Sequence, residues 1–388
     1  MRLRVVHDGV PNLHVSDDPA RPAGRAGASG GVRLAQARLE ACRDEQSRYS
    51  FLITSGVTKM DLPLLSALFT AFALSLYVLL DGFDLGVGAI LLVQPDEELR
   101  DRMVDSITPT WDGNETWLIM AGVALLAGFP IAYGILLPAF YLPLIIMLLA
   151  LGLRGVSFEF RVQTVQWRRV WDVAFGLGSI LAAMMQGLIV GGLIAGVSVD
   201  NERFTGSVFD VFQPFALLTA LAMLAGYVVL GAGWLHLKAT FQLRKFAERA
   251  LRLATPVFVA LAIAVCVAAA FVQPGIRATW MDHYLLLTLI AVLFFGVAGG
   301  LISLIGDSDA GPFASGICLF ALGVIGLGCA IFPDIVPFRL SLWAAASATL
   351  SHVFLLVGAV VVTPVVLGYS AFAYRVFRGK IPEKGWET

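Results

Sequence analysis

The 388-residue sequence contains few charged residues and few cysteines. Only 14% of its residues are Asp, Glu, Lys or Arg, whereas 58% are hydrophobic and the mean hydropathy is +0.81. Soluble domains contain about 45–50% apolar residues, so this composition indicates a polytopic membrane protein. A formal net charge of −1 indicates no nucleic-acid partner.

The four cysteines form no C-x-x-C pair, which argues against a disulfide framework and against a thiolate metal site. The sequence also lacks zinc-ligand spacing, a P-loop, a nucleophile elbow and a dinucleotide-binding fingerprint. His236, His283 and His352 lie on different apolar runs, so we interpret them as packing or interfacial residues rather than heme ligands. Gln186 lies within another apolar run and is interpreted as a contact between helices.

Residues 1–59 differ from the rest of the chain. They are rich in Arg, Gly, Ala, Asp and Ser, and they contain no apolar run long enough for a signal peptide. We interpret them as disordered, or as an extension that does not belong to the protein, with Met60 as the true start. Residues 60–388 are predicted to form the membrane domain.

The remaining sequence predicts an all-α membrane domain. Backbone polar groups in lipid must be bonded within their own segment, so the apolar runs are expected to be helices. Nine spans are predicted, at about 62–93, 115–134, 137–154, 173–197, 211–236, 254–273, 283–306, 313–332 and 344–372.

Lys and Arg are distributed unequally between the predicted loops. One alternating set of loops, together with the C-terminal tail, holds fifteen of them, whereas the other set holds only Arg203, Arg277 and Arg339. Cytoplasmic loops carry the excess of positive charge. The sequence therefore predicts a cytoplasmic C-terminus, with the start of the first span outside.

Two carboxylates interrupt the first span. Asp81 and Asp84 follow an uncharged run of 19 residues, and their spacing places them on one helix face with Gly88. An ionised carboxylate at mid-membrane depth costs roughly 2.5–3.5 kcal/mol. This face must therefore meet water, a proton, a metal or another protein.

Further polar residues occur at the ends of the next two spans. Asp112 lies between Trp111 and Trp117 at the start of the second span, where it is either an N-cap or a functional acid. At the end of the third span, Arg154 either extends to the membrane interface or pairs with Glu159, and Glu159 is alternatively a proton relay. Acid chains of this kind are typical of proton relays in membranes.

Three segments together resemble subunit II of cytochrome bd-type quinol oxidases. They are Asp81-Gly82-Phe83-Asp84-Leu85-Gly86-Val87-Gly88, Trp111-Asp112-Gly113-Asn114-Glu115 with Trp117, and Arg154 with Phe158-Glu159-Phe160-Arg161. The resemblance covers about 60–380, and its details are closer to the cyanide-insensitive branch.

The resemblance implies two four-helix bundles plus one peripheral helix. It also implies a homologous subunit I that carries hemes b and d, or heme b only, and the quinol site, because this chain lacks the G-R-Q-P-W segment of subunit I. The implied complex oxidises quinol and reduces O2 to water in the bacterial inner membrane, taking protons from the cytoplasm. A structural quinone in this chain and a small single-span subunit remain open.

The resemblance assigns roles to individual residues but no catalytic residue in this chain. The family residues linked to proton uptake and to the integrity of the heme region match Asp81, Asp84, Asp112, Arg154 and Glu159. Trp117 matches a tryptophan near an oxygen route. Two alternative functions are a proton-coupled transporter, which predicts inverted repeats and interrupted helices, and a purely structural subunit whose acids are exposed at the cytoplasmic interface.

Overall fold

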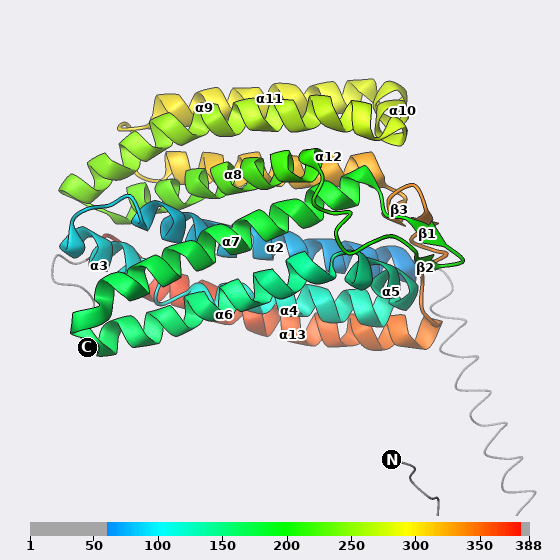
Figure 1. Cartoon of the computed structure of the whole chain (residues 1–388), viewed down its shortest axis with the longest axis horizontal. Coiled ribbons are helices and arrows are strands. Elements are labelled where there is room, and N and C mark those ends of the chain that lie inside the picture. Colours follow the sequence, from blue (N-terminus) through cyan, green and yellow to red (C-terminus); the bar gives the residue numbers. More distant parts are fainter. Residues whose placement is uncertain (1–59, 382–388) are drawn as a thin grey trace, which may run out of the picture. The chain divides into compact units, whose positions relative to one another are not determined.

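The computed structural model describes residues 60–381, so the prediction about residues 1–59 lies outside the described residues. The described chain is almost entirely helical, as Figure 1 shows. Its elements are α2 (Leu62–Leu91), α3 (Glu97–Asp105), α4 (Trp111–Gly128), α5 (Pro130–Ala139), α6 (Tyr141–Gln163), a 3-10 turn (Val165–Trp167), α7 (Arg168–Ala195), β1 (Val199–Asp200), β2 (Arg203–Phe204), α8 (Pro214–Lys238), α9 (Phe241–Val272), α10 (Pro274–Asp282), α11 (Tyr284–Leu304), α12 (Gly311–Ile331), β3 (Asp334–Val336), β4 (Leu340–Ser341) and α13 (Thr349–Val376).

Each of the nine predicted spans contains a helix. Eight described helices are long and apolar enough to cross a membrane: α2, α6, α7, α8, α9, α11, α12 and α13. The ninth, α4, begins with the polar residues Asp112, Asn114 and Glu115, so its apolar part is shorter. The prediction of an all-α polytopic membrane protein is confirmed.

The helices form two groups of four. In the first, α2 packs against α4 and α7, and α6 packs against α7; in the second, α8 packs against α9 and α12, and α11 packs against α12. The groups meet where α8 contacts α2 and α7, while α13 lies against α2 and α4 at the edge of the first group (Figure 1). This is the predicted arrangement of two bundles plus one peripheral helix.

The second span ends earlier than predicted. Instead of one helix over 115–134, the chain has α4, a break at Phe129 and then α5. Pro130 occupies the first position of α5, where its missing N–H costs nothing, but it cannot continue the hydrogen-bond ladder of α4. Pro138, by contrast, lies inside α5.

The α2–α8 contact depends on two glycines. A Cβ on Gly86 would lie 1.8 Å from the carbonyl oxygen of Tyr227 and 2.9 Å from the backbone nitrogen of Gly231. A Cβ on Gly231 would in turn lie 2.4 Å from the carbonyl carbon of Gly86. Small residues let helix backbones approach in this way, so the Gly82/Gly86 spacing in the sequence marks a helix contact.

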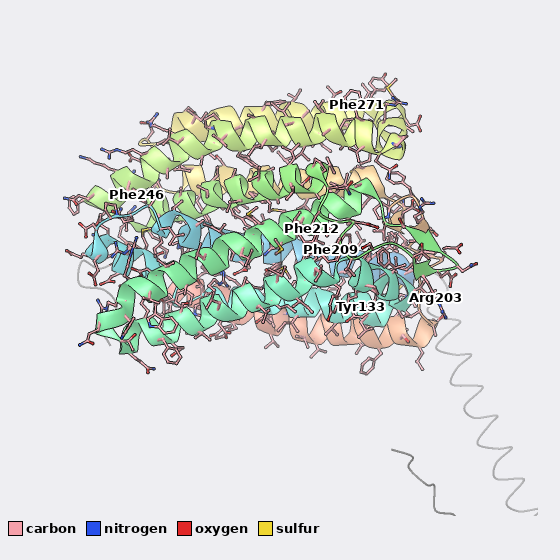
Figure 2. All side chains as sticks on the ribbon, viewed as in Figure 1. Tyr133, Arg203, Phe209, Phe212, Phe246 and Phe271 are labelled. Carbon is pink, nitrogen blue, oxygen red and sulfur yellow. The ribbon has the colours of Figure 1, made fainter. Side chains whose placement is uncertain are left out.

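The predicted basic loops meet at one end of the unit, which we name the α3 end. There Arg102 of α3 donates to Thr240 before α9, and Lys380 forms an ion pair of 3.0 Å with Asp309 between α11 and α12. Hydrogen bonds from Lys380 and Arg244 lower the pKa of Asp309. Arg203 lies at the opposite end, beside the strands (Figures 1 and 2).

A buried carboxylate joins three helices at the α3 end. Asp172 of α7 accepts hydrogen bonds of 2.7 Å from Arg100 of α3 and from Arg161 of α6. Its side chain is 0% exposed and both arginine side chains are 7% exposed. Asp101 also accepts from Arg161, at 2.5 Å. This network fixes α3 across the end of the bundle.

Replacing Asp172 by asparagine is expected to destabilise the protein by about 3–5 kcal/mol, because two buried guanidinium groups would lose their shared carboxylate. Thermal unfolding of the detergent-purified protein measures the effect. Glu97→Gln is the matched control, since Glu97 is 60% exposed and 3.9 Å from Arg168, and such a pair contributes about 0–1 kcal/mol. Equal unfolding temperatures for the two variants would contradict the structural role of Asp172.

Candidate functional site

Arg154 is the centre of a buried cluster at the junction of α2, α4 and α6. Its Nη2 donates to Asp81 Oδ1 at 2.6 Å and also to the carboxylate of Glu115. Arg154 and Asp81 are both 0% exposed, whereas the Glu115 side chain is 25% exposed. The guanidinium carbon lies 6.0 Å from the ring centre of Trp111, which adds a cation–π contact.

Asp84 has a separate set of partners. Its Oδ2 accepts a hydrogen bond of 2.8 Å from Asn114 Nδ2 of α4. The other end of that amide, Asn114 Oδ1, accepts a hydrogen bond of 2.9 Å from the Tyr374 hydroxyl of α13. Asp84 and Asn114 are buried. The chain Tyr374–Asn114–Asp84 therefore connects the peripheral helix to α2.

A third set of polar groups joins α2 to α7 and α8. Gln186 Nε2 donates to the Tyr77 hydroxyl at 2.8 Å, and Tyr227 donates to Gln186 Oε1 at 2.6 Å. Tyr77 lies one helical turn before Asp81 on the same face of α2. The interpretation of Gln186 as a contact between helices is confirmed.

The cluster leaves several buried polar atoms unpaired. Within the described part of the chain, Asp84 Oδ1 and the Nε and Nη1 atoms of Arg154 have no hydrogen-bond partner. Buried polar atoms are nearly always bonded to protein or to ordered water. Two carboxyl groups, those of Asp81 and Glu115, also share this one guanidinium, and Asp84 lies about one helical turn beyond Asp81 on the same face of α2. The arrangement is suited to holding water and exchanging protons.

The cluster lies near the α3 end of the first span. Asp81 is 19 residues beyond Leu62, where α2 begins, which places it about 28 Å along the helix. The hydrocarbon core is about 30 Å thick, so Asp81 lies close to its edge. Judged by their depth in the membrane alone, Asp81 and Asp84 could be exposed at the cytoplasmic interface, as the alternative of a purely structural subunit requires. However, both Asp81 and Asp84 are 0% exposed because neighbouring helices enclose them.

A comparison with known protein families shows to which family the chain belongs. The family model described as cytochrome bd terminal oxidase subunit II matches residues 62–377. The chain belongs to this family. The matched range covers α2 through α13, including every residue of the buried cluster, so the predicted resemblance is confirmed.

Individual proteins similar to this subunit II support the same family assignment. Subunit 2 of the cytochrome bd-I ubiquinol oxidase of Escherichia coli K12 is 30% identical over 358 residues, covering 80% of this chain and 93% of that protein. Subunit 2 of the cytochrome bd ubiquinol oxidase of Bacillus subtilis is 28% identical over 320 residues, covering 79% and 93%. A probable cytochrome oxidase subunit 2 of Haemophilus influenzae is 40% identical over 176 residues, covering 43% of this chain and only 47% of that protein.

A solved structure supports the fold. A chain of the bd oxidase from Geobacillus thermodenitrificans superposes with a TM-score of 0.69, covering 82% of this chain and 99% of that chain. The sequence identity is 15%, so this likeness shows the fold alone. Together, the apolar helices and the family indicate a bacterial inner-membrane protein that forms part of an oxidoreductase complex. The family favours the oxidase prediction over the transporter alternative.

Two of the predicted site residues of this subunit II lie outside the cluster. Glu159 is exposed on the outer side of α6, and Arg154 pairs with Asp81 and Glu115 instead. Residues 154 and 159 are about 140° apart around a helix, so they cannot share one inward face. Asp112 is also exposed, and its side chain does not cap α4, because Thr110 occupies the N-cap position.

Trp117 is wholly buried. It is 0% exposed and packs with Ala73, Tyr77 and Ala121, while Phe72 contacts its ring edge-on at 5.9 Å between centroids. It therefore contributes to the α2–α4 contact, close to the cluster. Its relation to an oxygen route stays a prediction.

The sequence reasoning missed three members of the cluster. Glu115 and Asn114 were part of a recognised segment, but the acid chosen from it was Asp112. A helical signal was present, because Trp111, Asn114 and Glu115 repeat at spacings of three and four and so share a face. Tyr374 carried no signal, since it lies 260 residues from Asn114 in the sequence.

Two described histidines of subunit II, His236 and His352, lie at opposite ends of the bundle. His236 Nδ1 is 3.2 Å from the carbonyl oxygen of Asp309 at the α3 end. His352 Nδ1 is 2.7 Å from Ser66 Oγ near the start of α2, at the other end of the bundle. The described residues also contain no group of three or more His, Cys, Asp or Glu that could hold a metal ion.

Proposed function

We propose that this chain is the non-heme subunit II of a cytochrome bd-type terminal quinol oxidase that reduces O2 to water. Membership of the family and relatives named as subunits of ubiquinol oxidases support this function. The partner is a heme-bearing subunit I, whose hemes supply the electron transfer to O2. The residues of this chain then serve proton uptake and the stability of the heme region.

The observation that carries the proposal is the buried cluster around Arg154. A fully enclosed acid and arginine pair is a costly way to join helices, since each buried ion costs several kcal/mol in desolvation. Ionisable groups inside membrane segments mark ion or proton paths. Because no described residue group suits a metal ion, we assign the cluster to proton transfer.

Each residue of the cluster has a distinct task in this proposal. Asp84 accepts the incoming proton at Oδ1, since its Oδ2 is held by Asn114. Arg154 stabilises the carboxylates of Asp81 and Glu115 between transfers. Glu115 passes the proton outward to subunit I, because it is the partly exposed acid among the three.

The orientation follows from the basic residues at the α3 end. The positive-inside rule supports a cytoplasmic location for that end and for the C-terminus. The cluster lies near the same end, as cytoplasmic proton uptake requires. We further propose that Asp112, exposed on α4, faces subunit I, because a membrane helix cannot present a carboxylate to lipid at low cost.

Two observations test the proposal. The chain is expected to co-purify with a heme-bearing subunit I, and Asp84→Asn is expected to lower quinol oxidase turnover about 10²-fold, the usual scale for removing a proton-transfer group. Heme absorbance spectra and oxygen consumption measure the two effects. Asp200→Asn, in the exposed strand β1 at the opposite end, is the control with unchanged turnover. A chain that purifies without any heme protein, or wild-type turnover in Asp84→Asn, would refute the assignment.

A further inference from the structure

Two small cavities adjoin each other near the cluster. The first lies between the loop before α4, the end of α8 and the end of α13, and the second lies between α4 and α13. Each has a volume of ≈ 10 Å³, which is about the lower limit for holding one water molecule. Both are lined by Pro109, Thr110 and Tyr374, so these residues form the wall between them. The Tyr374 ring therefore contacts both cavities.

The first cavity faces the α3 end. Its lining includes Ser106, Lys238 and Ile381, and Ile381 N donates to the backbone oxygen of Lys238 at 2.9 Å. The Lys238 ammonium is directed to the carbonyl oxygen of Phe377, at 2.6 Å, and lies 4.9 Å from the Trp234 ring centre. The positive charge is thus held by neighbouring groups at the wall of the cavity.

The second cavity reaches the cluster. Its lining includes Asn114 and Ser370, and the Asn114 amide is bonded to both Asp84 and Tyr374. Asp84 Oδ1, on the other side of the same carboxylate, is buried and has no partner among the described residues. Polar groups therefore extend from the α3 end to the Asn114 amide, which is bonded to the Asp84 carboxylate.

We infer that these two cavities hold the water that carries protons from the α3 end to Asp84, and that Tyr374 and Asn114 are positioning residues for this transfer. The inference rests on the proposed function and adds the route by which protons would reach Asp84. Water in such sites needs two to four polar partners. Thr110, Ser370, Asn114 and Tyr374 supply these around the second cavity.

Tyr374 acts through the orientation of the Asn114 amide. An amide has a donor end and an acceptor end. Because the Tyr374 hydroxyl donates to Asn114 Oδ1, the NH2 group is turned toward Asp84 Oδ2. The amide itself holds the carboxylate without exchanging its proton, which leaves Asp84 Oδ1 as the carboxylate oxygen without a partner among the described residues.

Tyr374→Phe tests the positioning role, since it removes the hydroxyl and keeps the ring that lines both cavities. In the complex with subunit I reconstituted into vesicles, cytoplasmic proton uptake after reaction with O2 is expected to slow by up to about tenfold, the rate equivalent of one neutral hydrogen bond at the upper end of its usual range. The solvent isotope effect on turnover should rise, and the heme spectrum should stay unchanged. A merely structural tyrosine would alter stability without changing the isotope effect.

Ser370→Leu tests the cavity independently, because it fills the second cavity without altering Tyr374. Ala371→Leu, on the neighbouring exposed position of α13, is the matched control. Slow proton uptake in Tyr374→Phe and Ser370→Leu, with normal uptake in Ala371→Leu, is the expected result. Wild-type uptake in Tyr374→Phe and Ser370→Leu, together with slow uptake in Asp84→Asn, would refute proton entry through the two cavities. The proposed function would still be supported. Wild-type uptake in Asp84→Asn would overturn both.

Discussion

Replacing Gly86 by alanine is expected to prevent stable assembly of the membrane domain. The added Cβ would lie 1.8 Å from the Tyr227 carbonyl oxygen and 2.6 Å from its carbonyl carbon. These are backbone atoms of α8, so no side-chain rotation relieves the overlap and the two helices must separate. Overpacking costs about 1–3 kcal/mol where side chains can move, and we expect at least the upper value here.

The amount of folded protein in membranes and its thermal unfolding temperature measure this effect. Gly122→Ala is the matched control, since a Cβ at Gly122 on α4 meets nothing within 4 Å. Gly231→Ala should reproduce the loss from the α8 side, where the Cβ would lie 2.3 Å from Val87 N. An unfolding temperature in Gly86→Ala equal to that of the control would show that α2 and α8 lie further apart than the structure indicates.

The α2–α8 contact also positions the polar groups behind the cluster. Tyr227, whose carbonyl meets Gly86, donates its hydroxyl to Gln186, and Gln186 donates to Tyr77, one turn before Asp81. Separating the two helices would therefore disturb the site as well as the fold. For this reason the stability of Gly86→Ala must be measured before its turnover is interpreted.

The spans could be predicted from the sequence because hydropathy is a local property. The uncharged run from Leu62 predicts α2, and helices of this kind need no knowledge of their neighbours. The breaks at Phe129 and Phe140 were harder to place, because Pro130 ends one helix while Pro138 continues another. The short helix α3 is polar and lies outside the membrane spans, so hydropathy gave no signal for it.

The site could be predicted only in part, because sequence does not reveal which face of a polar helix turn points inward. Asp112 and Asn114 are about 160° apart around α4, so one faces α2 and the other faces away. Asn114 is the inward residue, bonded to Asp84. Both carry polar side chains, and the spacing of Asn114 from Trp111 is too weak a local signal to decide between them. The outward acid was chosen from this segment for that reason.

Arg154 is expected to show the second large effect. Arg154→Gln would leave Asp81 without its guanidinium in an enclosed site where both side chains are 0% exposed. Removing one partner of a buried ion pair costs about 3–5 kcal/mol. The variant should therefore yield little assembled complex, as measured by the heme absorbance of purified membranes. Arg154→Lys should also yield little assembled complex, since an ammonium group cannot reproduce the planar fork of a guanidinium.

The double variant Asp81→Asn/Arg154→Gln separates stability from proton transfer. With both charges removed, neither position keeps the uncompensated buried charge that causes the large loss in each single variant. The stability losses of the single variants should therefore not add, which a double-mutant cycle measures as a coupling energy. Assembly should return in the double variant while quinol oxidase turnover stays low, because Glu115 would have lost the guanidinium that stabilises its carboxylate. Recovery of both assembly and turnover would mean that Asp81 and Arg154 only join α2 to α6. Proton transfer would then have to proceed through Asp84 without them.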